Sequence, residues 1–581
     1  MNQVKKAVIW VIAMATVCVA AARADDIVAG GLGKKLDEYL TRITPFGFAG
    51  ACLAAKDGAI ILNKGYGLAI RSNKVPNTAD TIFCTGSITK QFTAAAIMTL
   101  EMKGKLKTED PLSKYLEGVP EDKSAITLHH LLTHTSGLVP DVGPDYEPAS
   151  REETVKKILS LPLEFKPGER FTYSNVNYTL LAAVIEKVTG RPYEDYLREN
   201  LFKPAGMEWT GYKIPNWNER VVAHWYVAER DNVHSLIRLF PYWNLIGNGG
   251  ILSTTEDMYK WHLALLGNQI LSPEAKKKLY TPFLNDYAYG WDVLKTERGT
   301  LIQHNGGSSL GNNAEIRRYI DAGILTVLFC NQFYKGRPLI DSVRDKIEAI
   351  VFGEDVELPP VVVESDPVQL KKFEGTYELD SGGLLNISAR DNGFLVKAEG
   401  QKAITALAFP DAENPEAITS IGEKSAKIME AALQGDYSPF AEVSRDKERR
   451  IPRLRDFIER RVQEARERTG QILKVEPLYT VPSAMEEGAT ETVLRLKGEK
   501  GNIFFRMIWR DGINIGLGPI EIILLPISFT LLPLAPEGTE FAGYDLAQGC
   551  SFRVLFTVGP QGSATGITIR GKIKKIEGKK S

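Results

Sequence analysis

The sequence predicts an α+β protein in two folded parts, and three observations support this prediction. Residues 25–356 carry strand patterns at both ends and helical patterns between them, which is typical of one antiparallel sheet flanked by a helical region. Residues 357–366 are rich in proline, valine and acidic residues, as expected of a linker. Residues 367–581 begin as a meander of short strands, which predicts a small antiparallel β-barrel, interrupted by an α+β insert at about residues 423–518.

Local signals mark the elements of the first part. Alternating apolar residues over 49–62, with a turn at Asp57-Gly58, predict a hairpin. Helical periodicity then runs from residue 87 to about 189, where Gly190 supplies a C-cap. Strand patterns return at residues 300–303, 313–320 and 323–330. We therefore expect the sheet to combine strands from both ends of this part.

The second part shows strand patterns separated by glycine-containing turns. We expect its first four strands at residues 375–379, 384–389, 394–398 and 404–409. A charged helical stretch follows over residues 423–470, and strand patterns return over residues 492–518 and continue to about residue 573. A barrel with an insert and two tandem domains explain this order about equally well.

The first 24 residues have the pattern of a secretory signal peptide. Lys5 and Lys6 precede an apolar run over residues 7–22, and a small-x-small sequence around Arg23 precedes Asp25. The run is shorter than the roughly 20 residues that a spanning helix needs. We expect an exported protein, periplasmic or secreted in a bacterium, with no stable membrane span. An uncleaved anchor is the alternative interpretation.

The composition excludes several classes of protein. The chain has 581 residues, with 71 lysines and arginines against 72 aspartates and glutamates, so its formal net charge is −1. A nucleic-acid-binding protein usually carries a basic excess, and this chain has none overall. With 44% hydrophobic and 25% charged residues, it also lacks the composition of a disordered chain.

The cysteines indicate neither a zinc site nor a dense disulfide framework, because no Cys-x-x-Cys sequence occurs. Cys52 and Cys330 both lie in strand-like runs and can pair if those strands are neighbours. Buried free thiols are the alternative.

Ser87 and Lys90 form a Ser-x-x-Lys sequence at the start of an apolar helix. Positions i and i+3 share a helix face, so the Lys90 ammonium can reach the Ser87 hydroxyl. The first turn also places the Ser87 backbone N–H beside any oxyanion formed during attack. A second Ser-x-x-Lys sequence, at Ser444 and Lys447, lies in a densely charged run and is interpreted as a solvated helix face.

Two further short sequences carry groups of matching chemistry. Tyr173 and Asn175 form a Tyr-x-Asn sequence, in which the phenol can take the serine proton and the amide can hold substrate and lysine. His304 and Gly306 form a His-x-Gly sequence on a predicted strand. A strand edge offers backbone N–H groups, and a glycine lets substrate approach the backbone closely.

In chain order, these three motifs resemble those of the serine β-lactamase and penicillin-binding-protein superfamily. The resemblance is to the branch of class C β-lactamases, esterases and D-alanyl-D-alanine carboxypeptidases. It covers residues 40–355, and three connecting sequences agree with it, at residues 104–106, 131–138 and 249–257. More loosely, residues 367–410 and 541–569 resemble the lipocalin-like barrels that follow many such domains.

The resemblance implies a serine hydrolase that forms an acyl-enzyme on a small-molecule or peptide substrate, with no cofactor and no metal. The implied catalytic residues are Ser87 as nucleophile and Lys90 and Tyr173 as the proton-handling pair. The implied substrate-binding residues are Asn175, His304, Gly306 and Gly307. The backbone N–H groups of Ser87 and Gly307 would form the oxyanion hole.

One departure from the family pattern bears on the substrate. Many β-lactamases of this branch carry a lysine where His304 stands, and a neutral histidine holds a carboxylate less firmly. We therefore expect an ester, an amide or a D-amino-acid peptide as substrate, with a β-lactam as the alternative. An aromatic stretch either walls the acyl pocket or packs in the core: Trp217, Trp225, Tyr226, Phe240, Tyr242 and Trp243.

Two other interpretations compete. His130 and His134 have the spacing of metal ligands, but the glutamate of a His-Glu-x-x-His protease is absent, so we interpret them as capping or loop-fixing residues. A catalytically silent protein that captures a ligand in its C-terminal barrel is the other alternative. The intact Ser87, Lys90 and Tyr173 argue against it. The sequence assigns no oligomeric state and no role to the insert.

Overall fold

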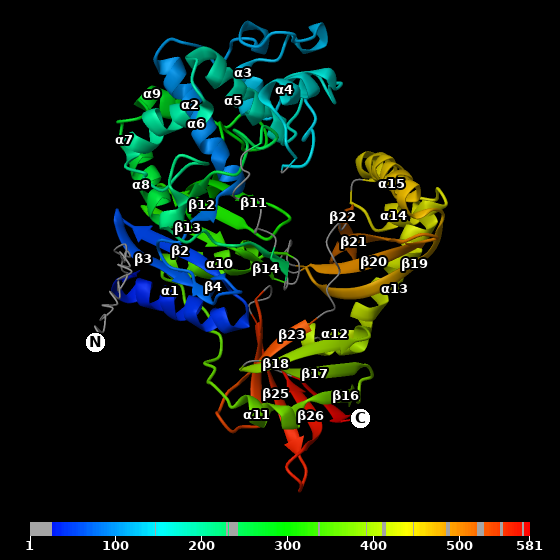
Figure 1. The fold of residues 1–581 in the computed structure, drawn as a ribbon. Helices are drawn as coiled ribbons and strands as arrows, with labels where there is room; N and C mark the ends of the chain where they lie inside the picture. The colour runs from blue at the N-terminus through cyan, green and yellow to red at the C-terminus, as the bar shows by residue number, and fades with distance from the viewer. Residues whose placement is uncertain are drawn as a thin grey trace, which may run out of the picture.

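The computed structural model describes residues 26–145, 147–227, 230–231, 242–334, 337–390, 392–409, 414–445, 447–483, 489–519, 528–546, 550–571 and 574–580. The predicted leader and Phe240 lie outside these residues. Figure 1 shows three bodies: the first part with its helical region uppermost, a barrel below it, and the insert beside them.

A seven-stranded sheet forms the centre of the first part, in the order β1-β3-β2-β13-β12-β11-β10. Its strands are β1 (Ile27–Val28), β2 (Gly50–Lys56), β3 (Ala59–Tyr66), β10 (Asp292–Thr296), β11 (Gly299–Gly307), β12 (Asn313–Tyr319) and β13 (Ile324–Cys330). Strand β2 pairs antiparallel with β13, so the two ends of this part meet in the middle of the sheet. The prediction of a sheet built from both ends is confirmed.

The turn between β2 and β3 explains why these residues form a hairpin. Asp57 has a φ of 51° and Gly58 a φ of 78°. Two successive positive φ values give the twist that joins neighbouring antiparallel strands, and aspartate and glycine are the residues that adopt them most easily.

The sheet has a core on each face because its side chains alternate. Leu53 packs with the helical region, whereas Cys52 and Ala54 face the opposite core. On that second face lie α1 (Gly30–Ile43) and α10 (Ile340–Phe352).

The first face is covered by α8 (Thr255–Leu266) and the rest of the helical region, in which α2 (Thr89–Met102) packs against α5 (Asn175–Thr189). The C-cap predicted for α5 is present, since Gly190 has a φ of 65°. The other helices of this part are α3 (Leu128–Leu132), α4 (Arg151–Ser160), α6 (Tyr193–Leu197), α7 (Lys203–Ala205) and α9 (Pro273–Leu279).

Short elements complete the first part. The short helical turns are η1 (Thr44–Phe46), η2 (Gly86–Ile88), η3 (Leu112–Lys114), η4 (Glu121–Lys123), η5 (Arg198–Phe202) and η6 (Trp217–Glu219). The short strands are β4 (Leu68–Ile70), β5 (Val75–Pro76), β6 (Phe83–Cys84), β7 (Tyr226–Val227), β8 (Arg230–Asp231), β9 (Leu252–Ser253), β14 (Gln332–Tyr334) and β15 (Arg337–Pro338).

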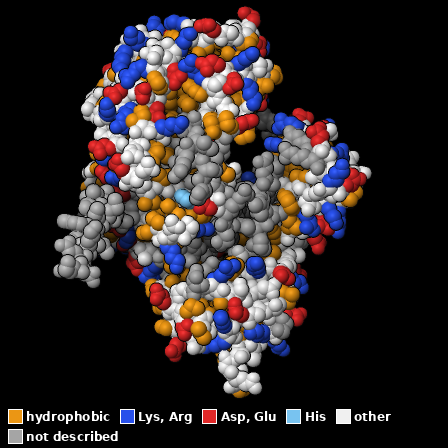
Figure 2. All heavy atoms as spheres, viewed as in Figure 1, with side chains coloured by type: hydrophobic (Ala, Val, Ile, Leu, Met, Phe, Trp, Pro, Cys, Tyr) orange, Lys and Arg blue, Asp and Glu red, His pale blue; other side chains and the backbone are white. Residues whose placement is uncertain are grey.

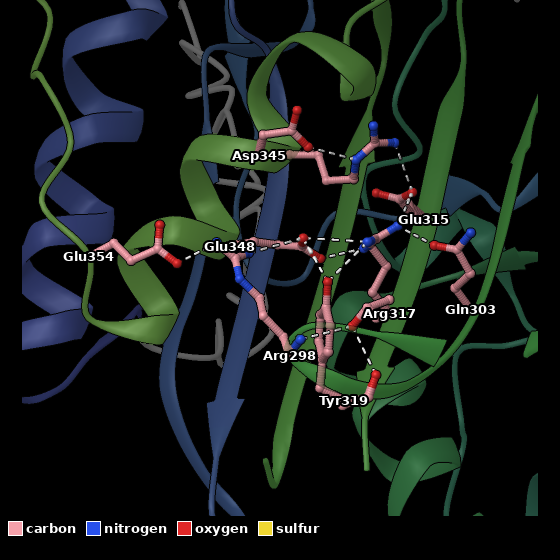
Figure 3. A network of polar contacts seen from close by, with 11 residues as sticks. Arg298, Gln303, Glu315, Arg317, Tyr319, Asp345, Glu348 and Glu354 are labelled. Atoms are coloured by element: carbon pink, nitrogen blue, oxygen red, sulfur yellow. Dashed lines mark hydrogen bonds and ion pairs between the residues drawn. The ribbon is translucent and has the colours of Figure 1, made fainter. Parts of the chain in front are cut away.

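A polar network joins α10 to strands β12 and β11, of which β11 carries the third motif (Figure 3). Arg317 on β12 donates to Gln303 on β11 and to Glu348 on α10. The Tyr319 hydroxyl donates to the same Glu348 carboxylate at 2.8 Å. Because Glu348 is buried, these charge-assisted bonds compensate its desolvation and hold β11 in place.

The second part opens with α11 (Pro367–Leu370) and η7 (Lys371–Phe373) and forms a closed antiparallel barrel. Its strands are β16 (Gly375–Leu379), β17 (Leu384–Arg390), β18 (Gly393–Glu399), β23 (Ser528–Pro533), β24 (Glu540–Asp545), β25 (Cys550–Val558), β26 (Ala564–Arg570) and β27 (Lys575–Lys580). Pairing of β16 with β27 closes it. The predicted fold class, an α+β domain followed by a β-barrel, is confirmed.

Aromatic side chains fill the barrel. The ring centroids of Phe373 and Phe556 lie 4.7 Å apart, and those of Phe394 and Phe541 lie 4.9 Å apart. All four residues are buried in one cluster with aliphatic side chains from the surrounding strands. The described interior of the barrel is therefore a packed core.

The insert lies between β18 and β23 along the chain. Its helices are α12 (Gln401–Ala408), α13 (Pro415–Leu433), α14 (Ser438–Glu442) and α15 (Lys447–Thr469). Its sheet consists of β19 (Ile472–Pro482), β20 (Thr490–Gly498), β21 (Asn502–Arg510) and β22 (Ile513–Pro519). The chain thus leaves the barrel after three strands and returns for the remaining five.

The strand predicted at residues 404–409 is wrong, because α12 occupies this position. Gly400, with a φ of 85°, turns the chain out of β18. Ala403, Ile404 and Leu407 are then buried together at helical spacing. An apolar run this short fits either period, and the packing of α12 against β18 and β19 decides between them.

Cys52 and Cys330 are free, buried thiols, as is Cys84. Cys52 pairs across the sheet with Leu328 and not with Cys330, so the alternative of unpaired thiols is correct. Burial raises the pKa of the Cys52 thiol to about 12, which leaves it unreactive at neutral pH.

The barrel packs directly on the first part. Tyr544 of β24 contacts Phe46 of η1, with ring centroids 5.7 Å apart, and Leu532 and Ala542 join the same apolar cluster as α1 and α10. On the face shown in Figure 2, basic and acidic side chains are interspersed. None of the described helices is both long and apolar enough to cross a bilayer.

Candidate active site

The first motif lies where η2 runs into α2. Lys90 Nζ is 3.1 Å from Ser87 Oγ, 2.8 Å from Asn175 Oδ1 and 2.7 Å from the backbone oxygen of Asn248. The structure therefore brings the first two motifs together around one amine. Asn175 is fixed in turn, because its Nδ2 donates to Asp141 Oδ1 at 2.8 Å.

The environment of Lys90 favours a neutral amine. Lys90 is fully buried, and burial lowers the pKa of its ammonium to about 7, although Asp141 and Asp145 oppose this shift. Two of its neighbours, Asn175 Oδ1 and the Asn248 carbonyl, can only accept hydrogen bonds. A neutral amine that donates its two hydrogens to them directs its lone pair at the Ser87 hydroxyl. This arrangement suits a general base.

Tyr173 has the complementary property. Burial raises the pKa of its phenol well above the usual value, and the neighbouring Ser87 hydroxyl only partly opposes this shift. Lys90 Nζ lies 4.8 Å from the centre of the Tyr173 ring. At neutral pH the phenol stays protonated, so it can donate a proton where Lys90 can accept one.

His134 holds Tyr173 in place from both sides along the chain. The backbone N–H of Thr172 donates to the His134 carbonyl at 2.9 Å, and that of Ser174 donates to His134 Nδ1 at 3.1 Å. The His134 and Tyr173 ring centroids are 4.3 Å apart. His130 accepts from the Thr127 N–H at 3.2 Å in a capping box at the start of α3. Both contacts fit the interpretation of capping and loop-fixing histidines.

Strand β11 touches the nucleophile turn through its backbone. A Cβ atom on Gly306 would lie 2.1 Å from the Thr85 oxygen and 2.5 Å from the Ser87 nitrogen. Gly86 has a φ of 53°, and a Cβ there would lie 2.4 Å from the Gly307 nitrogen. Only glycine permits an approach this close. These contacts place the backbone nitrogens of Ser87 and Gly307 on adjoining segments of the chain.

His304 lies behind this contact and not at the pocket surface. Its ring is buried, with Nδ1 2.6 Å from the Asn305 carbonyl and Nε2 3.0 Å from the Tyr287 hydroxyl. Burial, reinforced by Lys90, lowers the pKa of His304 to about 3. The imidazole is therefore neutral, and these contacts fit a tautomer in which Nδ1 donates and Nε2 accepts.

A small pocket opens at Ser87. The described residues that line it are Cys84, Gly86, Ser87, Asp145, Asn175, Leu245, Asn248, Gly249, Gly250, Gly307, Ser308 and Asn312. Of the residues that the sequence predicts for the site, Ser87, Asn175 and Gly307 line this pocket, whereas Lys90, Tyr173, His304 and Gly306 are not among its lining residues. Trp225 packs in a buried cluster with Cys84 and Leu245, which fits the core-packing alternative for the aromatic stretch.

Sequence reasoning missed two members of this site. Asn248 contributes a backbone oxygen, which no side-chain pattern reveals, although the glycines that follow it indicate a tight turn. Asp145 lies in a loop with no motif around it. The turn that carries Ser87 is anchored to the segment after Asn248, since the Thr85 N–H donates to the Ile251 carbonyl at 2.9 Å.

Comparison with known proteins gives the family. The family model for β-lactamases, described as "Beta-lactamase", matches residues 47–348. The chain belongs to the β-lactamase family. The resemblance inferred from the three motifs is thus confirmed, and the family is one of serine hydrolases that include penicillin-binding proteins.

Individual relatives agree with the family. The chain is 28% identical over 397 residues to "Penicillin-binding protein 4*" of Bacillus subtilis, covering 63% of this chain and 87% of that protein. It is 36% identical over 253 residues to "Putative penicillin-binding protein PbpX" of the same species, covering 43% of this chain and 62% of that protein. The crystal structure of FmtA from Staphylococcus aureus shares the fold, with a TM-score of 0.50 at 23% identity over 59% of this chain and 96% of that one.

Proposed function

We propose that this β-lactamase-family protein is an exported serine hydrolase that forms an acyl-enzyme on an ester, an amide or a D-amino-acid peptide. The proposal depends mainly on one observation: a fully buried lysine amine, with its pKa lowered to about 7, lies 3.1 Å from the hydroxyl of Ser87. A lysine in this state can activate a serine at neutral pH without a metal ion.

The proposed reaction proceeds in two halves. Neutral Lys90 takes the Ser87 proton while Oγ attacks the substrate carbonyl, and the backbone N–H groups of Ser87 and Gly307 stabilise the oxyanion. Tyr173 gives a proton to the leaving group as the acyl-enzyme ester forms. Water then attacks this ester. The same groups transfer the protons in the opposite order, and the acid is released.

Two observations support an ester or amide over a β-lactam as the substrate. The described lining of the pocket contains no lysine, arginine or histidine side chain that would pair with a substrate carboxylate. His304, where many relatives carry a lysine, is buried and neutral. Two relatives of the chain are named penicillin-binding proteins, so a penicillin is a suitable probe even if it is a poor substrate.

The alternative of a silent ligand-binding protein has less support. Aromatic side chains fill the described interior of the C-terminal barrel, so a ligand there would have to displace Phe373, Phe394, Phe541 or Phe556. By contrast, the contacts of Lys90 Nζ with Ser87 and Asn175 support a role in acyl transfer.

Covalent labelling tests the proposal. The purified protein is treated with a fluorophosphonate and, separately, with a fluorescent penicillin, and its mass is measured. We expect one adduct per chain on Ser87, none in Ser87→Ala, and unchanged labelling in Ser444→Ala, which alters the second Ser-x-x-Lys sequence. Absence of fluorophosphonate labelling in the folded wild type would contradict the proposal.

A substrate panel then identifies the bond that is broken. The panel contains a chromogenic cephalosporin, short p-nitrophenyl esters and D-alanyl-D-alanine peptides, each assayed beside Ser87→Ala. Rapid turnover of the cephalosporin would favour a β-lactamase proper.

Export is tested separately. Full-length protein is expressed in a bacterium and recovered from the periplasm or the medium. The proposal expects a mature N-terminus at Asp25.

A further inference from the structure

The pocket beside Ser87 carries a single charge type. Among its described lining residues Asp145 alone has a carboxylate, and no lining side chain is basic. The Lys90 amine lies within hydrogen-bond distance of Ser87, Asn175 and the Asn248 carbonyl, and with a pKa of about 7 it is only about half protonated at pH 7. The pocket therefore offers a negative charge without a fixed partner.

Asp145 differs in this respect from its neighbour Asp141. Asp141 accepts a hydrogen bond from Asn175 Nδ2 at 2.8 Å and is exposed. Asp145 is partly buried. It makes no hydrogen bond and no ion pair with any residue that the structure describes. Burial and the neighbouring Asp141 raise the pKa of the Asp145 carboxyl to about 6, although Lys90 opposes this shift, so the carboxyl is mostly ionised at pH 7. A carboxylate in this setting gains from a cation supplied by a ligand.

A second lining residue also lacks a partner. Asn312 is buried, and its Nδ2 makes no hydrogen bond to any described group, while its Oδ1 accepts from Ser308. A buried amide donor without a partner is costly unless a ligand or water satisfies it. Among the residues that the structure describes, the pocket thus holds an acceptor and a donor without partners, which indicates that a polar ligand completes it.

We propose that Asp145 is a specificity-determining residue that binds the α-ammonium group of the substrate, so the site takes esters and amides of amino acids with a free amino group. The α-ammonium is the cation that fits best, because only a cation within a few bonds of the reacting carbonyl can share one small pocket with the nucleophile. This inference rests on the proposed function, since it names the substrate class of the same site.

The reaction that follows is balanced with water as the only co-reactant. Ser87 Oγ forms an ester with the carbonyl carbon of the amino acid, and the bond to the leaving amine or alcohol breaks. The Ser87 proton passes by way of Lys90 and Tyr173 to that leaving group. Water then cleaves the ester and releases the free amino acid, while Asp145 stays ionised throughout.

The test compares substrates with and without the cation. The p-nitroanilides of D-alanine and L-alanine, and their N-acetyl derivatives, are assayed at pH 7 with the full chain. For the preferred enantiomer we expect kcat/KM to be at least about tenfold higher with the free amine than with the acetylated amine. In Asp145→Asn this ratio should fall to about 1, through loss of activity on the free amine alone.

The controls separate this inference from the proposed function. Glu147→Gln removes an exposed carboxylate from the same loop and should leave the ratio unchanged. Asp145→Asn should still be labelled on Ser87 by the fluorophosphonate, which shows that the variant is folded and active. If the wild type is labelled, any of three results would overturn the inference but not the proposed function. These are a ratio of 1 or less, no turnover of any anilide, and a ratio that is unchanged in Asp145→Asn. Absence of labelling would overturn both.

Discussion

The chain contains two Ser-x-x-Lys sequences, and the structure treats them differently. Ser87 belongs to η2, which runs directly into the helix of Lys90, and Lys90 is fully buried against the second motif. Ser444 precedes α15, whose first residue is the exposed Lys447, and the buried Ser444 Oγ has no hydrogen-bond partner among the described residues. Equal spacing thus brings the lysine amine to the serine hydroxyl in a desolvated site only where a helical turn already includes the serine.

The largest expected effect comes from the two lysines. Lys90→Met keeps the size and burial of the side chain but removes the base, so the rate of fluorophosphonate labelling should fall by about 10³-fold. Lys447→Met should leave that rate unchanged within about twofold. The rates are measured from time courses in which labelling is stopped at set times and read by gel fluorescence, and circular dichroism shows whether each variant is folded. Similar rates in the two variants would remove the basis of the comparison.

The close approach of β11 to the nucleophile turn gives the next effect. Gly306→Ala places a methyl group 2.1 Å from the Thr85 oxygen, so the strand must shift away from Ser87. We expect the labelling rate to fall by about 10²-fold, as for loss of an oxyanion donor. Gly31→Ala on α1, where a Cβ meets nothing within 4 Å, is the matched control. A Gly306→Ala protein with wild-type labelling would show that the contact does not matter for chemistry.

The smallest of these effects concerns the orientation of the amine. Asn175→Ala removes one of the two acceptors that direct the Lys90 lone pair at Ser87, and the other, the Asn248 carbonyl, remains. We expect about a tenfold lower labelling rate. Asn218→Ala, at an exposed position, serves as the control and should retain the full rate. Unchanged labelling of Asn175→Ala would mean that the Asn248 carbonyl alone orients the amine.

The fold could be predicted where the signal is local. Asp57-Gly58 and Gly190 predict a hairpin turn and a helix end from their backbone preferences alone, and both are present. Residues 404–409 could not be assigned in the same way, because their apolar run suits a strand as well as a helix and only the contacts of α12 settle the choice. Whether the charged segment forms an insert or a tandem domain also depends on pairing between distant strands, such as β18 with β23.

For the site too, the contacts between residues close in sequence could be predicted, and those between distant segments could not. Ser87 and Lys90 are three residues apart where η2 runs into α2, so sequence spacing suffices to predict their contact. The positions of the Asn248 carbonyl, the backbone contact at Gly306 and the Asp145 carboxylate depend on how separate segments of the chain fold together. For His304, the sequence identifies the motif, but only the structure shows that Tyr287 holds the ring behind the pocket.

The pH dependence of the reaction at Ser87 tests most directly the claim that the fold makes Lys90 a neutral base. The second-order rate of fluorophosphonate labelling is measured from pH 5 to 10. Because burial lowers the pKa of Lys90, the rate should rise with pH as the ammonium loses its proton, with an apparent pKa near 7, and this limb should be absent in Lys90→Met. A limb near 10, the usual pKa of a lysine, or an unaltered limb near 7 in Lys90→Met would contradict the account.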